Sequence, residues 1–456
     1  MLAIIINRAK VEGKVNGVIP HLMENGLSIL RYADDTVIFL DHDLELARNM
    51  KALPCMFEKG LKINFYKSEI FCFGQAKECE KEYSELFGCR QGSLPFKYLG
   101  LPMHYRKLGN SDWKHVEERF EHRLSGWKEK LLSVGGRLVL INSVLSSLPM
   151  FMLSFFAIPK GVLKKLEYFR SRFFWQNDQH KKKYHLIKWD QVRQPKEQGG
   201  LGIIDLEVQN KCLLSKWLFK LANEDGTWQT VIRNKYLRSK PLGSCCKKPG
   251  VSHFWAGLMD VKQVFLSLGS FQIGDGTQVR FWEDTWCGDQ PLKISYPSLF
   301  NIVRKKGATV AEVISSNPLN VSFRRGLHGE RLLAWYDLVE RVMGLELREG
   351  RDVFRWGLNK TGFFSVKSMY SFLINNGLKV SQEIWRTKIP LKIKIFMWYI
   401  KRGVLLTKDN LARRNWNGSQ SCCFCHYNES IQHLFFDCRL AKGNFMAASV
   451  GQVAAK

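Results

Sequence analysis

Residues 31–40 read RYADDTVIFL and place two adjacent carboxylates, Asp34 and Asp35, inside an otherwise apolar run. Adjacent acids repel each other and are costly to bury, so strand-forming neighbours do not hold them without a reason. The flanking stretches LSILRY and TVIFL are candidate strands. Paired as a hairpin, they would present both carboxylates at its tip, where acids can bind two Mg²⁺ ions for an in-line displacement at phosphorus. A solvated turn rich in aspartate is the alternative.

The overall charge indicates a polyanionic partner. The chain of 456 residues contains 69 Lys and Arg against 42 Asp and Glu, a formal net charge of +27. Because this excess accompanies 14 Trp, 13 Tyr and 30 Phe, it favours nucleic acid over a membrane surface. A basic surface that serves only solubility is the alternative.

The apolar stretches are too short for membrane targeting. The N-terminal MLAIIINRAK has a short apolar core with no cleavage site after it, and VLSSLPMFMLSFFAI (144–158) is too short for a bilayer and contains Pro149. We therefore expect no signal peptide and no transmembrane segment. The 12 cysteines are then expected to be reduced, in a nuclear or cytoplasmic setting.

The periodicity of the chain predicts an α+β fold. Residues 1–105 alternate short strand-like runs with turns, including LKINF and EIFCFG, whereas residues 111–174 and 210–221 are helical in pattern. FQIGDGTQVRFW (271–282) predicts a hairpin that turns at Asp275-Gly276, and DVFRWGLNKTGFFSVKSMYSFL (352–373) predicts a short hairpin that leads into a helix. PLKIKIF (390–396) alternates like a strand, but a helix that starts at Pro390 is equally compatible with it.

Four potential metal ligands crowd near the C-terminus. Cys422, Cys425, His433 and Cys438 follow the spacing Cys-x2-Cys-x7-His-x4-Cys. Soft ligands at short spacing on a loop-rich segment suit tetrahedral Zn²⁺ in a closed structural site. Cys423 and His426 are possible substitutes in the ligand set. The alternative is a group of buried free cysteines in a reducing compartment.

Several motifs together resemble a reverse transcriptase of the non-LTR (LINE-type) retrotransposons. RYADDTVIFL, GLKINFYKSEIFCFG (60–74) and FKYLGLPM (96–103) are similar, in order and spacing, to the family's palm. Residues 189–221 and 271–286 resemble its post-palm region, and residues 385–438 its zinc-binding segment. The resemblance implies an RNA-directed DNA polymerase with RNA and DNA as partners, dNTPs as substrates, and Mg²⁺ and Zn²⁺ as cofactors. It also implies successive domains: a partial palm (1–105), a helical thumb and connection (106–240), a mixed connecting region (241–375) and a zinc-binding domain (380–442).

The resemblance assigns roles to individual residues. Asp34 and Asp35 would bind Mg²⁺, Tyr32 would lie beside the nucleic-acid backbone, and Lys67 would donate a proton to pyrophosphate. The turn of Tyr98, Leu99 and Gly100 would steady the primer end. A solvated lysine and a packed aromatic residue are the alternatives for Lys67 and Tyr98. Residues 111–175, in thumb position, carry cations that could neutralise phosphates or simply form a solvated helix face: Lys114, Arg119, Arg123, Lys128, Lys130 and Arg137.

One departure from the family pattern bears on catalysis. A polymerase palm needs a further aspartate on a neighbouring strand upstream of the hairpin, but residues 1–31 contain no Asp. Their only acids, Glu12 and Glu24, lie in turn-like segments. The family's fingers are not recognisable either. We therefore expect a chain that is truncated relative to the family and is not an autonomous polymerase. The alternative is a non-enzymatic remnant that binds nucleic acid and zinc. The tail, residues 443–456, is predicted to be disordered.

Overall fold

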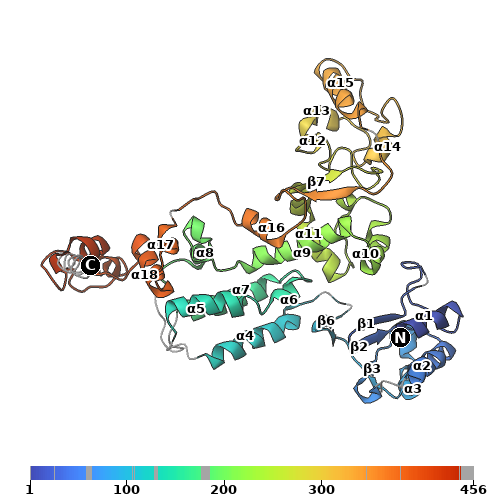
Figure 1. Ribbon diagram of the computed structural model, residues 1–456, viewed down its shortest axis with the longest axis horizontal. Coiled ribbons are helices and arrows are strands. Elements are labelled where there is room, and N and C mark those ends of the chain that lie inside the picture. Colours follow the sequence, from blue (N-terminus) through green and yellow to red (C-terminus); the bar gives the residue numbers. More distant parts are fainter. Residues whose placement is uncertain are drawn as a thin grey trace, which may run out of the picture. The chain divides into compact units, whose positions relative to one another are not determined.

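The computed structural model describes residues 2–24, 26–57, 64–104, 106, 108–127, 132–175, 185–345, 347–380, 382–440 and 442. The predictions made for Lys128, Lys130 and the tail 443–456, and most of the predicted strand LKINF, lie outside the described residues. The described residues combine helices with short strands, which confirms the predicted mixture of the two (Figure 1). None of the described helices is long and apolar enough to cross a membrane.

Contacts divide the chain into two compact units, and each unit collects stretches that are far apart in the sequence. The first contains Met1–Asp112, Ser154–Ala157 and Lys211–Met369. The second contains Trp113–Leu153, Ile158–Asn210 and Tyr370–Lys456. Helices α9 (Leu206–Asn223) and α16 (Val366–Leu373) contain residues of both units. The consecutive domain boundaries inferred from the sequence stay a prediction.

The N-terminal part of the first unit holds the hairpin that contains the aspartates. Strands β1 (Ile29–Tyr32) and β2 (Asp35–Ile38) pair antiparallel, with Tyr32 opposite Asp35. Ile29 and Ile38 pack against a buried cluster from α1 (Leu2–Val11) and α2 (Leu44–Phe57) (Figure 1). The other elements of this part are η1 (Phe65–Lys67), β3 (Glu69–Ile70), η2 (Gly74–Lys77), α3 (Glu80–Phe87), β4 (Arg90–Gln91), β5 (Phe96–Tyr98), β6 (Leu101–Met103) and η3 (Asn110–Trp113).

The rest of the first unit is built around one long-range strand pair. Strand β7 (Gly269–Gln272) pairs antiparallel with β8 (Val353–Trp356). Its helical elements are α10 (Thr227–Ile232), η7 (Arg233–Leu237), η8 (Leu242–Ser244), α11 (His253–Ser267), α12 (Leu292–Ser295), α13 (Pro297–Phe300), α14 (Val310–Ile314) and α15 (Glu330–Met343).

The strand pair corrects two predictions. Residues 271–282 do not form a hairpin, because β7 pairs with β8 and not with the residues after Gly276. Nor is β8 the first strand of a local hairpin, although the predicted helix follows it as α16. The physical reason is aromatic packing: Phe271 and Phe354 lie opposite each other with ring centroids 5.0 Å apart, and Phe354 also contacts Phe265 of α11 at 4.7 Å.

The second unit is almost entirely helical, as residues 111–174 predict. Its elements are α4 (Lys114–Gly126), α5 (Val134–Leu140), the π-helical turn η5 (Ile141–Leu145), α6 (Met150–Leu153), α7 (Lys160–Trp175), α8 (Trp189–Arg193), η6 (Lys196–Gln198), α17 (Glu383–Arg386), α18 (Leu391–Lys401), α19 (Lys408–Ala412) and the π-helical turn η9 (His433–Asp437). Pro390 stands at the N-cap of α18 with φ −53° and ψ 142°. The helical alternative for residues 390–396 is therefore correct, and the buried residues of the helix are Ile395, Trp398 and Tyr399.

Candidate metal centre and aspartate hairpin

Four side chains converge near the C-terminus. One ligand atom each from Cys422, Cys425, His433 and Cys438 lies within 4.8 Å of the others. Cys425 Sγ is 3.0 Å from His433 Nε2. Sulfur and nitrogen ligands lie about 2.0–2.3 Å from a Zn²⁺ ion, so four such atoms around one ion stand roughly 3.5–4 Å apart. Among the described residues this is the one group of three or more acidic, His or Cys side chains that could hold a metal.

The first two ligands belong to a short knuckle. Ser421 and Asn428 form an isolated antiparallel bridge, and the Cys422 N–H donates to Tyr427 O at 2.8 Å, which closes the loop between them. Inside this loop the Phe424 N–H points to Cys422 Sγ at 3.4 Å. The knuckle thus presents its sulfur atoms to the following helical turn.

The other two ligands are placed by a π-helical turn. His433 opens η9, and the Cys438 N–H donates to His433 O at 2.7 Å. This bond spans five residues, so one turn of the wider helix separates the two side chains and both can face the same side. Cys438 is 1% exposed and Cys422 is 6% exposed, so two of the four ligands are shielded from water. A closed structural site needs such shielding.

The electrostatics of the cluster suit a cation. The backbone hydrogen bond at Tyr427 acts to lower the pKa of Cys425, but burial and the neighbouring thiols of Cys422 and Cys438 outweigh it, and the pKa is raised. Sulfur atoms this close disfavour each other's charged form, and a divalent ion removes that conflict. The donor set therefore fits Zn²⁺.

Two positions that the sequence left ambiguous lie apart from the cluster. Lys408 of α19 places its Nζ 3.3 Å from Cys423 Sγ and 2.6 Å from Ser421 O. Cys423 is thus directed to a lysine on the outside of the knuckle, and neither it nor His426 joins the ligand cluster. The supporting role of Lys408 was not foreseen, because nothing in its sequence context distinguishes it from a solvated lysine.

The predicted hairpin tip is formed by Ala33 and Asp34. Ala33 has φ +52°, a conformation that residues other than glycine rarely adopt, and the Arg31 side chain donates to its carbonyl at 3.2 Å. Asp34 and Asp35 are both exposed. Within the described part of the chain, no third carboxylate, His or Cys joins them in a cluster. The hairpin therefore presents two carboxylates and not a complete two-metal site.

The remaining predicted residues are exposed or close to the surface. Tyr32 is 66% exposed beside the aspartates, and Lys67 is exposed in η1 with its N–H bonded to Asn64. Of the predicted turn Tyr98–Gly100, Leu99 and Gly100, with φ +50° and +79°, form the turn between β5 and β6, whereas Tyr98 ends β5. Among the described residues, no hydrogen bond or ion pair joins Lys67 to either aspartate. The catalytic and nucleic-acid roles of these residues stay predictions.

Arg137 departs from its predicted role. Its side chain was expected to contact phosphates, but Arg137 is 1% exposed, and its Nη2 donates to Leu132 O at 3.2 Å. A buried guanidinium cannot reach a polyanion at the surface. By contrast, Lys114, Arg119 and Arg123 on α4 are exposed. The helical pattern alone did not separate the buried cation from the solvated ones.

The chain is similar to one protein family over its C-terminal segment and to two plant proteins over longer stretches. Residues 364–444, which contain all four ligands, match a family described as zinc-binding in reverse transcriptase. The chain is 29% identical over 354 residues to an Arabidopsis thaliana protein provisionally named a ribonuclease H protein, covering 74% of this chain and 56% of that relative. It is also 29% identical over 147 residues to an uncharacterized mitochondrial protein of the same plant, covering 32% of this chain and 95% of that relative.

These matches support the predicted retroelement origin and the predicted Zn²⁺. The chain spans little more than half the length of the longer relative. The segment that matches the zinc-binding family thus also contains the four converging side chains.

Proposed function

We propose that this chain is a portion of a non-LTR retroelement reverse transcriptase that binds nucleic acid and Zn²⁺ and does not polymerise DNA by itself. The observation that carries the proposal is the convergence of Cys422, Cys425, His433 and Cys438 within the segment that matches the family. When bound, Zn²⁺ would tie the knuckle to the helical turn η9. The four side chains would orient the ion, and burial of Cys438 would exclude water from it.

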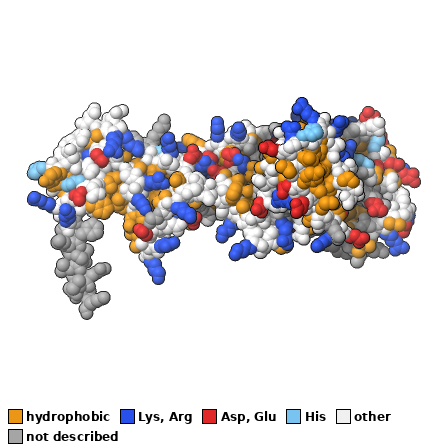
Figure 2. All heavy atoms as spheres, turned by 90° about the horizontal axis from the view of Figure 1, so that it is seen from above, with side chains coloured by type: hydrophobic (Ala, Val, Ile, Leu, Met, Phe, Trp, Pro, Cys, Tyr) orange, Lys and Arg blue, Asp and Glu red, His pale blue; other side chains and the backbone are white. Residues whose placement is uncertain are grey.

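The charge of the chain supports nucleic acid as the partner. The formal net charge is +27, and Lys and Arg side chains are spread over the face shown in Figure 2. Exposed cations bind phosphates without reading sequence, and the binding weakens as salt rises. The proposal therefore expects binding to RNA and DNA with a steep salt dependence.

The hairpin supports the second half of the proposal. Asp34 and Asp35 would hold Mg²⁺ at the hairpin tip in a complete polymerase site, with a primer 3′-hydroxyl and a dNTP as reactants. The described residues supply no third ligand to that tip. Because both metal ions must be positioned for the displacement, two exposed carboxylates alone give at most background chemistry. Mg²⁺-dependent polymerisation by this chain is the competing function.

Primer extension separates these two functions. The purified chain is incubated with an RNA template, a DNA primer, dNTPs and Mg²⁺, beside its Asp34→Ala variant. The proposal expects no product that depends on Asp34. Extension by the unchanged chain that disappears in Asp34→Ala would establish the competing polymerase.

Metal content tests the zinc half with a matched control. Cys425→Ser removes a ligand, whereas Cys423→Ser removes a neighbouring thiol that contacts Lys408 and not the cluster. We expect about one zinc per chain for the unchanged protein and for Cys423→Ser, and a large loss for Cys425→Ser. Equal zinc in all three proteins would refute the assigned site.

A further inference from the structure

A long stretch of the first unit carries cations and no acids. Between Asp225 and Asp260 the sequence contains no acidic residue. The cations of this stretch fall within residues 233–248, which we call the basic loop: Arg233, Lys235, Arg238, Lys240, Lys247 and Lys248. The loop runs from η7 through η8 to the residues before α11. None of its residues was singled out by the sequence motifs.

Two of the six cations are neutralised by the acids at either end of the stretch. Arg233 Nη1 lies 2.5 Å from Asp225 Oδ1, and Lys247 Nζ lies 2.7 Å from Asp260 Oδ1. The other four cations are exposed, and among the described residues none has a carboxylate within ion-pair distance: Lys235, Arg238, Lys240 and Lys248. These four are the positive charges that the loop offers to a partner.

Packing beneath the loop holds its backbone in place. The Tyr236 ring stacks on Trp255 with centroids 4.6 Å apart, and Cys245 Sγ lies 3.8 Å from Tyr236 O, which joins the two halves of the loop. Lys262, 9% exposed, donates to Gly243 O at 2.8 Å and to Cys245 O at 2.5 Å. A buried ammonium bonded to two carbonyls holds the loop from within.

Cations from both halves of the loop act on one buried thiol. Burial raises the pKa of the Cys245 thiol, and Lys262, Lys240 and Lys248 lie near enough to act in the opposite direction. Lys240 and Lys248 thus act on the same buried thiol, although eight positions separate them along the chain. Arg238 has φ +46° and Ser239 has φ +66°, so a tight left-handed turn stands between Lys235 and Lys240.

The loop is fixed to the segment that precedes the aspartate hairpin. Asn234 Nδ2 donates to Leu22 O at 2.8 Å, within the first unit. Leu22 lies a few residues before β1. The basic loop thus has one direct contact with the segment before β1.

We infer that the basic loop is a binding site for the phosphodiester backbone of a nucleic acid, through Lys235, Arg238, Lys240 and Lys248. This inference rests on the proposed nucleic-acid function and gives it a location. The loop supplies unpaired positive charge on a preorganised backbone, which is what phosphate contacts require. Its tyrosine ring is already stacked on Trp255, so the loop offers charge and not a stacking surface for bases. Binding there is indifferent to sequence.

The test compares two variants of the full chain with the same loss of charge. The loop variant combines Lys235→Gln, Arg238→Gln, Lys240→Gln and Lys248→Gln. The control variant combines Arg331→Gln, Arg348→Gln, Lys360→Gln and Lys367→Gln, four exposed cations of the same unit that are also without an ion pair among the described residues. Affinity for a 5′-labelled single-stranded RNA and for a duplex DNA is measured from 50 to 400 mM salt. Thermal unfolding checks that both variants fold.

The expected result is a change in the salt dependence that is specific to the loop. Each lost phosphate contact lowers the slope of log affinity against log salt by about 0.7–0.9, so the loop variant should lose a slope of about 3 and bind on the order of a hundredfold more weakly at about 200 mM salt. The control variant should keep most of the slope. A charge-conserving variant, with Lys235→Arg, Arg238→Lys, Lys240→Arg and Lys248→Arg, should also keep the slope.

Other outcomes overturn specific claims. If the unchanged chain binds neither nucleic acid, the proposed function fails and the inference fails with it. If the unchanged chain binds but both variants lose the same slope, the proposed function stands and the basic loop is not a distinct site. If polyglutamate competes as well as RNA at equal charge, the loop is a general anion surface and the inference is wrong.

Discussion

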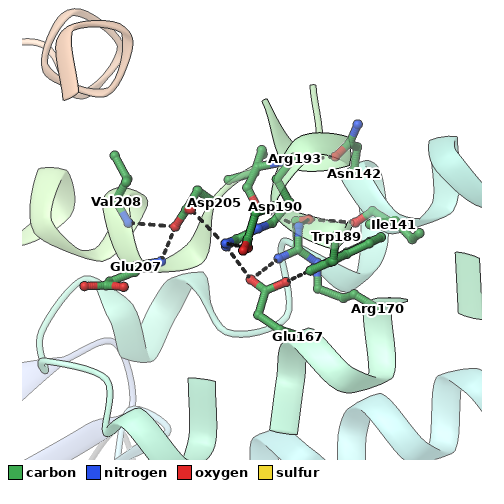
Figure 3. Close-up of polar contacts among 12 residues, drawn as sticks. Ile141, Asn142, Glu167, Arg170, Trp189, Asp190, Arg193, Asp205, Glu207 and Val208 are labelled. Atoms are coloured by element: carbon green, nitrogen blue, oxygen red, sulfur yellow. Dashed lines mark hydrogen bonds and ion pairs between the residues drawn. The ribbon is translucent and has the colours of Figure 1, made fainter. Parts of the chain in front are cut away.

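Arg170 is fully buried and pairs with Glu167, whose Oε1 lies 2.8 Å from Arg170 Nη1 (Figure 3). The same carboxylate accepts a hydrogen bond from Trp189 Nε1 at 2.7 Å and faces Arg193 at 3.5 Å. Arg170 also donates to Ile204 O at 2.6 Å. Burial lowers the pKa of Arg170, and Glu167 opposes that shift. The Glu167 carboxylate therefore joins α7 to α8, and the Arg170 guanidinium joins α7 to the segment before α9.

Removal of Glu167 should destabilise the second unit strongly. Glu167→Ala leaves a buried guanidinium without its carboxylate, which typically costs about 3–5 kcal/mol. Urea denaturation followed by fluorescence measures the change. Glu118→Ala is the control, because Glu118 is exposed and its ion pair with Lys114, at 3.8 Å on the same helix, is also exposed. Such a pair contributes little, so this substitution should change the free energy of unfolding by less than about 0.5 kcal/mol. A small effect of both substitutions would show that the pair of Glu167 and Arg170 does not stabilise the second unit.

Gly200 should tolerate no side chain. A Cβ atom at this buried position would lie 2.0 Å from the carbonyl oxygen of Gln194, and that obstacle is backbone. Because the loop must shift to accept it, Gly200→Ala should cost about 3 kcal/mol or more in the free energy of unfolding. Gly126→Ala, at the end of α4 with no atom within 4 Å of the new Cβ, should be neutral or slightly stabilising. Thermal unfolding of the two variants makes the comparison.

Local features of this fold were accessible from the sequence. The hairpins at Ala33-Asp34 and at Leu99-Gly100 depend on a two-residue turn between apolar runs, and the helices of residues 111–174 on their own periodicity. The Cys and His spacing likewise predicted the ligand cluster. In each case the residues that determine the feature are neighbours in the chain.

Features that depend on distant residues were not accessible. Strand β7 looked like half of a hairpin because its true partner, β8, lies far along the chain and is selected by aromatic packing. Arg137 looked solvated because the elements that bury it are not adjacent in sequence. Cys423, which is directly adjacent to Cys422 in sequence, contacts Lys408 of α19, and the Cys spacing does not reveal that contact. Such contacts leave no periodic signal.

Asp352 is the distant residue that shapes the loop after β7. Its Oδ1 accepts the N–H groups of Gly274 at 2.8 Å and Gly276 at 2.9 Å, and its Oδ2 accepts that of Gln278 at 2.9 Å. Asp352→Ala leaves these N–H groups without an acceptor and should cost about 3–5 kcal/mol, measured by urea denaturation. Asp289→Ala, which removes an exposed carboxylate, should stay within about 0.5 kcal/mol of the unchanged chain. Equal losses of unfolding free energy in the two variants would show that the three hydrogen bonds to Asp352 do not stabilise the fold.

Cys212 should make the protein sensitive to alkaline pH. It is fully buried in α9, and burial raises the pKa of its thiol from 9.0 to about 12. The unfolded chain loses this proton above pH 9 while the folded chain keeps it, so the stability held below pH 9 falls as the pH rises toward 12. At pH 10 the loss is about 1.4 kcal/mol. Cys212→Ala should lose less stability between pH 8 and pH 10 than the unchanged chain, whereas Cys246→Ala, at an exposed thiol, should behave like the unchanged chain.

Metal removal should loosen one segment and leave the first unit folded. The ligands lie in residues 422–438, and Lys408 and Glu429 tie α19 to the knuckle through a 3.0 Å bond from the Lys408 N–H to Glu429 Oε1. Without a cation, the clustered sulfur atoms oppose the closed geometry, so a chelator should open this segment. Limited proteolysis with mass spectrometry should then find new cuts between residues 408 and 438, suppressed when Zn²⁺ is restored. Cuts that appear equally in α11, which contains none of the ligands, would indicate general unfolding and contradict a local structural role for the metal.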